Sequence, residues 1–147
     1  VADIEDGLKF ANSSFDVVCA SKILEQLYDT KFFMDECFRI LKPNGLCLVT
    51  AYNFNHFENR LRIMAGKYPK LLGAYPEDHG GENIRVLNIH KIKELCHETG
   101  FLIEEIRGMP FTKSFGKYSD FAMNMFGQVW PGLSKLFIIK AKKRQEH

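Results

Sequence analysis

Two short apolar runs with a helical segment between them constrain the fold of this chain more than any other feature. Residues 15–20 read FDVVCA and residues 46–52 read LCLVTAY, and neither run alternates with polar residues. Each run therefore predicts a strand that is covered on both faces. Between them, Asp29 or Thr30 can cap a helix whose apolar residues share one face, namely Phe33, Cys37, Ile40 and Leu41. The KPNG stretch that follows ends the helix and turns the chain, so the pattern predicts a βαβ crossover with two neighbouring parallel strands.

The rest of the chain continues this α/β pattern. Short helices are expected at residues 21–27 and 57–64, and a longer helix is expected within residues 87–101. The apolar face of the longer helix consists of Ile89, Ile92, Leu95 and Cys96, and Gly100 can form its C-terminal cap. Further strands are expected at residues 101–106 and 135–142. These patterns predict one domain over residues 1–147.

Two irregular segments lie between the predicted elements. We interpret residues 53–83 as a lid or a substrate-side insertion, because loops of this length in compact domains are often functional. Residues 108–131 are rich in aromatic residues and methionine. They could line an apolar pocket, pack in the core or form a protein interface.

Composition and charge exclude several classes of protein. The chain has 147 residues, 46% of them hydrophobic, and a net charge of +2, which favours a packed domain and no nucleic-acid partner. The basic run KAKKR at 140–144 is interpreted as a strand end and tail. The four cysteines show no metal-ligand spacing, so we expect no metal site and buried free thiols in a reducing compartment. With neither a signal peptide nor an apolar run of ~18 residues, the sequence predicts a cytoplasmic protein with no membrane partner.

Four stretches together resemble the C-terminal portion of class I S-adenosylmethionine-dependent methyltransferases that act on small molecules. They read ADIEDGLKFANSSFDVV, SKILEQL, FRILKPNGLCLVT and IKELCHETGFLIEEIRG, and FIIKAKK is similar to the family's last strand. The resemblance implies a partial Rossmann-like fold with flanking helices and a mixed sheet of about four strands. The last strand is expected to be antiparallel and inserted between the second and third. The family's first three strands and its glycine-rich cofactor loop have no counterpart here, so the chain is expected to be truncated and not catalytic alone.

The resemblance also implies a set of cofactor-binding residues for S-adenosylmethionine. Asp3 matches the family's acidic residue that accepts a hydrogen bond from the adenine amino group, and Ile4 matches its apolar neighbour. Ala20, Ser21 and Lys22 match the turn beside the methionine part of the cofactor. The alternative for Asp3 is a solvated residue near a frayed terminus. Binding of the cofactor by this chain alone is open, because the glycine-rich loop and the acidic residue that holds the ribose are missing.

Residues on the acceptor side follow from their position at strand ends. Gln26 stands where many relatives of the family have a histidine, and an amide cannot act as a base. Tyr52, Asn53 and His56 follow the second apolar run, at the edge of a parallel sheet where ligands gather, and are expected to face the substrate. His79, flanked by carboxylates in a loop, is the candidate base, with a surface-loop histidine as the alternative. Glu25 is expected on a helix surface.

The missing neighbour of the first strand predicts an exposed apolar sheet edge, which natural proteins usually cover. We therefore expect a homodimer, or an N-terminal half supplied separately, to complete the fold. Two functions remain open: a small-molecule methyltransferase, or a non-catalytic interaction module that self-associates through this edge. A lipid-surface protein is a third, supported by composition alone.

Overall fold

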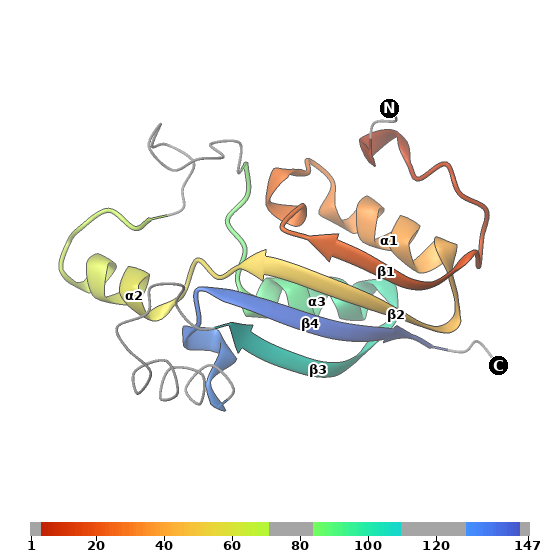
Figure 1. Cartoon of the computed structure of the whole chain (residues 1–147). Helices are drawn as coiled ribbons and strands as arrows, with labels where there is room; N and C mark the ends of the chain where they lie inside the picture. The colour runs from red at the N-terminus through yellow and green to blue at the C-terminus, as the bar shows by residue number, and fades with distance from the viewer. Residues whose placement is uncertain (1–3, 71–83, 110–128, 145–147) are drawn as a thin grey trace.

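The computed structural model describes residues 4–70, 84–109 and 129–144 (Figure 1). Its helices and strands, in chain order, are β1 Phe15–Ser21, α1 Thr30–Ile40, β2 Leu41–Tyr52, α2 Phe57–Met64, α3 Ile89–Thr99, β3 Phe101–Met109 and β4 Leu136–Lys143. Three short 3₁₀ turns join them: η1 Ile4–Asp6, η2 Leu24–Gln26 and η3 Pro131–Leu133. Residues 71–83 of the segment at 53–83, and residues 110–128 of the segment at 108–131, lie outside the described residues, so the roles predicted for the two segments remain predictions.

The strands form one mixed sheet with the order β1-β2-β4-β3. β1 and β2 are parallel, with Ala20 opposite Val49, which confirms the predicted pairing of neighbouring strands across α1. β4 is antiparallel to both β2 and β3 and lies between them. The expected sheet of four strands with an inserted antiparallel last strand is therefore confirmed.

Local sequence signals explain where the two longer helices begin and end. The Asp29 side chain accepts a hydrogen bond from the Phe32 N–H and caps α1, and Asn88 caps α3 in the same way through the Lys91 N–H. Gly100 ends α3 with a φ of +94°, a conformation in which a Cβ is strained. The caps therefore account for where these helices begin or end, and the predicted apolar faces account for why α1 and α3 are helical.

Both longer helices lie on the same side of the sheet, and the core forms between them and the strands (Figure 1). Alternate residues of the two central strands point into this core and are fully buried; they include Cys47, Val49, Ala51, Phe137, Ile139 and Ala141. Their neighbours in sequence point to the opposite face and are half-exposed. We call the side packed against α1 and α3 the covered face, and the opposite side the open face.

The prediction that β1 is covered on both faces is wrong for the described residues. Val17 is 48% exposed and Cys19 is also exposed, whereas Ala20 is buried. The reason is that Val17 and Cys19 lie on the open face, over which the described part of the chain places no helix. Within the described residues, β1 pairs with β2 alone, so its other edge is unpaired.

The expectation of four buried thiols is likewise wrong for Cys19, but it holds for the other three cysteines, Cys37, Cys47 and Cys96. A hydrogen bond with Cys37, followed by burial, raises the pKa of the Cys47 thiol far above its usual value. Burial raises the pKa of Cys96 to about 11. The Cys47 and Cys96 thiols therefore stay protonated and act as small apolar core residues.

Candidate functional site at the carboxyl ends of β1 and β2

The turn after β1 has an unusual backbone conformation that places two polar residues at the carboxyl ends of β1 and β2. Lys22 has a φ of +50°, which is uncommon for a residue with a side chain, and its N–H donates to the Thr50 carbonyl at 2.9 Å. The Thr50 hydroxyl donates to Ser21 Oγ at 3.0 Å. The Lys22 ammonium lies 5.6 Å from the centre of the Tyr52 ring. The helix expected at 21–27 is therefore reduced to the η2 turn, and Ser21, Lys22 and Tyr52 meet at the ends of β1 and β2.

Glu25 is buried, which corrects the expectation of a helix-surface carboxylate. It is 2% exposed, and its Oε1 accepts a hydrogen bond from the Tyr52 N–H at 2.6 Å. Its Oε2 has no hydrogen-bond partner within the described residues. The Glu25 carboxylate therefore accepts the hydrogen bond of the Tyr52 N–H just beyond Ser21 and Thr50, which are the last residue pair of β1 and β2. Sequence spacing did not reveal this role because η2 is a single turn with no periodic face.

The η2 turn also holds the segment that leads into α3. The Glu25 carbonyl accepts hydrogen bonds from the N–H groups of Ile84 and Arg85, at 2.9 and 3.1 Å. The Arg85 guanidinium donates to the carbonyls of Leu27, at 2.7 Å, and Tyr28. Gln26, between these anchors, is exposed. Hydrogen bonds therefore hold Ile84 and Arg85 beside the carboxyl ends of β1 and β2.

Asn53 and His56 are brought to the same edge, but both are fully buried. The Asn53 amide donates to the carbonyls of Gly132 and Ser134, at 2.8 and 2.9 Å, which joins β2 to the chain just before β4. Burial lowers the pKa of His56, which the Glu58 carboxylate opposes and nearby cations reinforce, so the imidazole is neutral at pH 7. Both side chains thus lie within the protein at the end of β2.

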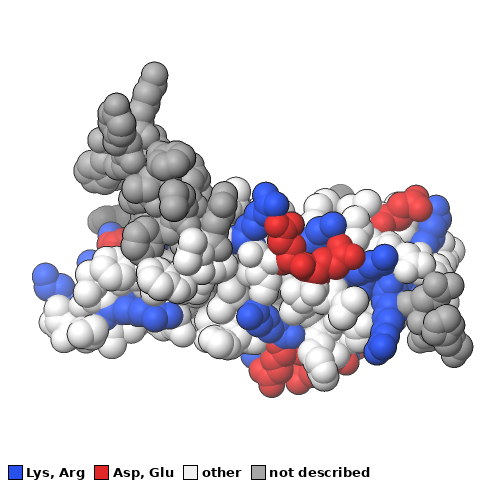
Figure 2. Space-filling model, turned by 90° about the horizontal axis from the view of Figure 1, so that it is seen from below, with Lys and Arg blue, Asp and Glu red and all other residues white. Residues whose placement is uncertain are grey.

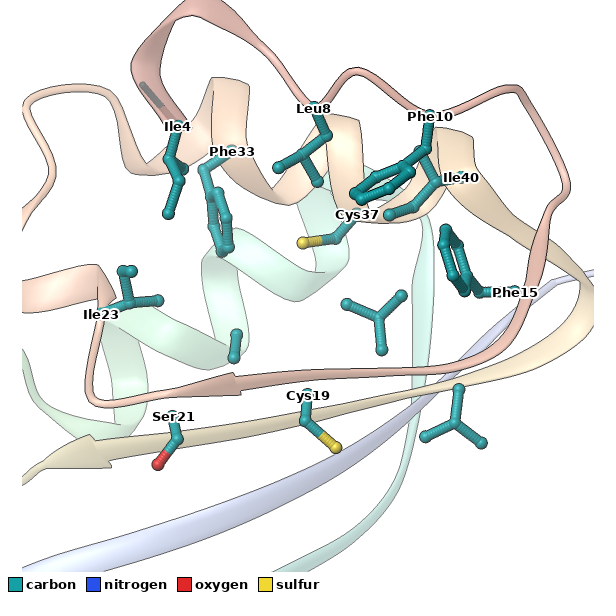
Figure 3. Close-up of a pocket in the computed structure, with 13 residues that line it drawn as sticks. Ile4, Leu8, Phe10, Phe15, Cys19, Ser21, Ile23, Phe33, Cys37 and Ile40 are labelled. Carbon is teal, nitrogen blue, oxygen red and sulfur yellow. The ribbon is translucent and has the colours of Figure 1, made fainter. Parts of the chain in front are cut away.

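A cavity of about 530 Å³ runs along β1 beneath the N-terminal segment and α1 (Figure 3). Ile4, Ile23 and Ser21 lie at one end of it, and Phe10 and Phe15 lie at the other. Ile4, Ala20 and Ser21 of the predicted cofactor residues all line this cavity. Its walls are almost entirely apolar, and its volume is in the range of small-molecule sites.

Two predicted site residues, Asp3 and His79, lie outside the described residues. Within residues 4–70, 84–109 and 129–144, no group of three or more His, Cys, Asp or Glu side chains is arranged to hold a metal ion. The helices of the same three stretches are all too short or too polar to cross a bilayer. Figure 2 shows basic and acidic side chains interspersed on the face in view, in keeping with the small net charge.

Comparison with known proteins yields one family and several relatives. The family described as "Methyltransferase domain" matches residues 1–49. A "Probable S-adenosylmethionine-dependent methyltransferase" of Mycolicibacterium smegmatis is 30% identical over 102 residues, which are 69% of this chain and 34% of that protein. The mitochondrial ubiquinone biosynthesis O-methyltransferase of Bos taurus is 25% identical over 114 residues, 77% of this chain and 30% of that protein. The chain thus spans about a third of these relatives' length.

A solved structure shares the fold. The crystal structure of an SAM-dependent methyltransferase from Thermotoga maritima has a TM-score of 0.62 and 16% sequence identity. The superposition covers 95% of this chain and 61% of that one. The four-stranded sheet and its helices therefore have a counterpart within a larger domain.

Proposed function

Because this chain is the counterpart of the C-terminal portion of class I S-adenosylmethionine-dependent methyltransferases, we propose that it forms part of the cofactor site of a small-molecule methyltransferase. The observation that carries the proposal is the convergence of Ser21, Lys22 and Tyr52 where β1 and β2 end. In open sheets of this kind, ligands bind outside the carboxyl ends of the parallel strands. The left-handed Lys22 is the sort of costly backbone conformation that clusters at functional sites.

The residues at this edge have the chemistry that the cofactor requires. Ile4 supplies apolar cover for the adenine ring, and Asp3, its neighbour in sequence, accepts a hydrogen bond from the adenine amino group. Ala20, Ser21 and Lys22 line the methionine side, where the small Ala20 leaves space and the Lys22 ammonium can pair with a carboxylate. The bound cofactor supplies an activated methyl group, so this chain's residues contribute mainly alignment and exclusion of water.

Gln26 and Tyr52 are the proposed contacts to the methyl acceptor. Gln26 is exposed beside the strand ends, and Tyr52 is half-buried beneath the Lys22 ammonium. For Asn53 and His56, contact with the acceptor stays a prediction, and their full burial favours support of the strand end instead. His79 as a base also stays a prediction. Gln26 can orient an acceptor by hydrogen bonds but cannot remove its proton.

We further propose that a strand added at the β1 edge completes this site. These 147 residues contain no glycine-rich loop of the GxGxG type, and such a loop lets the cofactor approach the backbone. β1 has an unpaired edge within the described residues, and the cavity runs along that edge. A strand added there would gain backbone hydrogen bonds. It would come from an N-terminal half or from a second copy of the chain.

A second candidate function follows from the open face and the unpaired β1 edge. Val17 on β1 is 48% exposed and Leu102 on β3 is 58% exposed. An apolar face next to an unpaired edge suits an interaction module that self-associates without catalysis. In that case Val17→Asp would convert a dimer to a monomer in sedimentation velocity, whereas the same change at the exposed Val86 would not. A wild-type chain that sediments as a monomer at micromolar concentration would rule this candidate out.

Calorimetric titration of the chain with S-adenosylhomocysteine tests the methyltransferase proposal. We expect saturable binding of one ligand per chain at micromolar affinity, at chain concentrations where a second copy completes the site. Lys22→Ala should weaken this binding about fivefold by removing one charge-assisted hydrogen bond. Lys31→Ala, which removes a lysine from α1 instead, is the matched control and should bind like the wild type. Absence of saturable binding by the chain, alone and at concentrations where it self-associates, would overturn the proposal for this chain and leave the interaction module.

A further inference from the structure

Glu25 is the one buried carboxylate among the residues whose burial the structure describes. Its Oε1 accepts a hydrogen bond of 2.6 Å from the Tyr52 N–H, and its Oε2 has no partner in the described part of the chain. A buried carboxylate with a single hydrogen bond costs stability, because its lost hydration is only partly replaced. Natural proteins concentrate such costly arrangements at functional sites. The burial of Glu25 at the strand ends therefore points to a role in the site rather than in the stability of the fold.

The backbone of Tyr52 depends on Glu25 because β1 ends before reaching it. The last residue pair of β1 and β2 joins Ser21 and Thr50. On the other side of β2, Tyr52 pairs with Leu136 of β4. The Glu25 side chain therefore takes the place of the neighbouring strand that would otherwise accept from the Tyr52 N–H. This hydrogen bond holds the last residue of β2 on the side that β1 leaves open.

Tyr52 in turn lies beside the ammonium group that the proposed cofactor site uses. The Lys22 ammonium is 5.6 Å from the centre of the Tyr52 ring. The main chain of Lys22 is held by the hydrogen bond from its N–H to the Thr50 carbonyl at 2.9 Å. The long side chain of a lysine has several rotatable bonds and no fixed direction of its own. The Tyr52 ring therefore guides where the ammonium lies, and Glu25 holds the backbone that carries this ring.

The turn that contains Glu25 is itself well anchored. The Glu25 carbonyl accepts hydrogen bonds from the N–H groups of Ile84 and Arg85, at 2.9 and 3.1 Å. The Arg85 guanidinium donates at 2.7 Å to the Leu27 carbonyl, directly after η2. Leu24, the first residue of η2, is fully buried. The carboxylate therefore projects from a fixed turn, as a side chain that positions another residue must.

We propose that Glu25 is a positioning residue that fixes Tyr52, and through its ring the Lys22 ammonium, so that the ammonium can bind the carboxylate of the cofactor's methionine part. This inference rests on the proposed cofactor site. It assigns Glu25 no contact with the ligand. The effect of Glu25 is on the methionine end of the cofactor and not on the adenosine part.

The test compares two substitutions of Glu25 that differ in one property. Glu25→Leu fills a similar volume without a hydrogen-bond acceptor, whereas Glu25→Gln keeps an oxygen that can accept from the Tyr52 N–H. Glu98→Leu is the matched control, because Glu98 is exposed on α3. Each protein is titrated with S-adenosylhomocysteine and with methylthioadenosine, which lacks the amino and carboxylate groups of the methionine part. The chain concentration is kept the same throughout, at a value where a second copy completes the site.

The measured quantity is the ratio of the two affinities. The wild type should bind S-adenosylhomocysteine at least about tenfold more tightly than methylthioadenosine, because the charged groups add charge-assisted hydrogen bonds. The preference should fall below about threefold in Glu25→Leu and stay within about twofold of the wild-type value in Glu25→Gln and Glu98→Leu. A general defect in the fold would weaken both ligands by the same factor and would overturn the proposal. A wild type that binds both ligands equally would also overturn it.

A double-mutant cycle shows whether Glu25 acts through Lys22. Lys22→Ala should lower the preference by itself, since it removes the ammonium. Adding Glu25→Leu to Lys22→Ala should then change the preference by less than about twofold, because the two residues act on one contact. Independent effects, in which the double variant loses the product of the two single losses, would overturn the proposal.

Backbone hydrogen exchange tests the same inference without any ligand. In Glu25→Leu the Tyr52 amide should exchange at least about tenfold faster, while the amides of Val49 and Ile139 are unchanged. Glu25→Gln should show a smaller change, since its amide oxygen can still accept from Tyr52. Unchanged exchange at Tyr52 would overturn the inference alone. If exchange changes as expected but the wild type binds neither ligand, the proposed cofactor function fails, and with it the role of Glu25 in that site.

Discussion

The covered face and the open face of the sheet are made by the same strands, yet they differ in how deeply their side chains are buried. On the covered face, alternate residues of β2 and β4 are fully buried against α1 and α3. On the open face, the intervening residues of β2 and β4 are half-exposed, and Lys140 of β4 forms an ion pair with the exposed Glu104 of β3. The covered face therefore supplies most of the apolar burial that stabilises the fold. The open face and the β1 edge are where a further polypeptide can bind.

Two adjacent residues of β4 test the difference in packing between the two faces. Ile139→Ala removes a fully buried side chain from the covered face and should lower the free energy of unfolding by about 2–5 kcal/mol. Ile138→Ala makes the same change on the open face, where the side chain is half-exposed, and should cost less than half as much. Urea denaturation measures both. Equal losses would mean that the open face is as well packed as the covered one.

The end of β2 should depend on a buried amide. Asn53→Ala removes the amide that donates to the Gly132 and Ser134 carbonyls and should destabilise the protein by about 1–3 kcal/mol. Asn12→Ala, at an exposed position that also accepts one hydrogen bond, should cost less than about 0.5 kcal/mol. Thermal unfolding monitored by circular dichroism compares the two. If Asn53→Ala is as mild as its control, the amide does not join β2 to the chain before β4.

A substitution at Gly100 tests how much the left-handed C-terminal cap of α3 contributes to the stability of the protein. Gly100→Ala places a Cβ at a φ of +94° and should cost about 1 kcal/mol. Gly132→Ala is the control, because a Cβ there would have open space and no positive φ. Its effect on the urea midpoint should be close to zero. A neutral Gly100→Ala would show that the end of α3 can rearrange at no cost.

The smallest effect should come from pH. Because burial depresses the pKa of His56 in the fold, the unfolded chain binds a proton first as the pH falls through about 6.5, and stability decreases below that point. The His56 contribution is fully present above pH 7. His56→Gln should therefore flatten the decline in unfolding free energy between pH 8 and pH 5.5. A decline in His56→Gln that is identical to that of the wild type would contradict the assignment.

Local signals in the sequence were sufficient for the two longer helices, the four strands and their order, but not for the helix expected at residues 21–27, which is a single 3₁₀ turn. The cap at Asp29, the left-handed Gly100 and the helical spacing of apolar residues depend on neighbours within a few positions, so α1 and α3 could be predicted. The exposure of Val17 could not be predicted. An apolar run shows that both faces of a strand can be buried, but it does not show whether a helix layer covers each face. β1 was therefore predicted to be covered on a face that the described residues leave open.

The site was less predictable because its main contacts are long-range. Ser21, Lys22 and Tyr52 could be placed at one edge from the βαβ pattern and the resemblance. The burial of Glu25 depends on Tyr52, 27 residues later, and no spacing signals it. The hydrogen bonds from Arg39 to Leu8 and Phe10 were missed for the same reason, although the Glu36–Arg39 spacing on a helix is itself a recognisable ion-pair pattern.

Amide chemical-shift mapping of the chain with S-adenosylhomocysteine tests the proposed site most directly, since it reports where the ligand binds. Saturable shifts at Ile4, Ala20, Ser21 and Lys22, with little change in β3, would agree with a cofactor site at the carboxyl ends of β1 and β2. Shifts confined to other parts of the chain, or none at millimolar ligand, would contradict it.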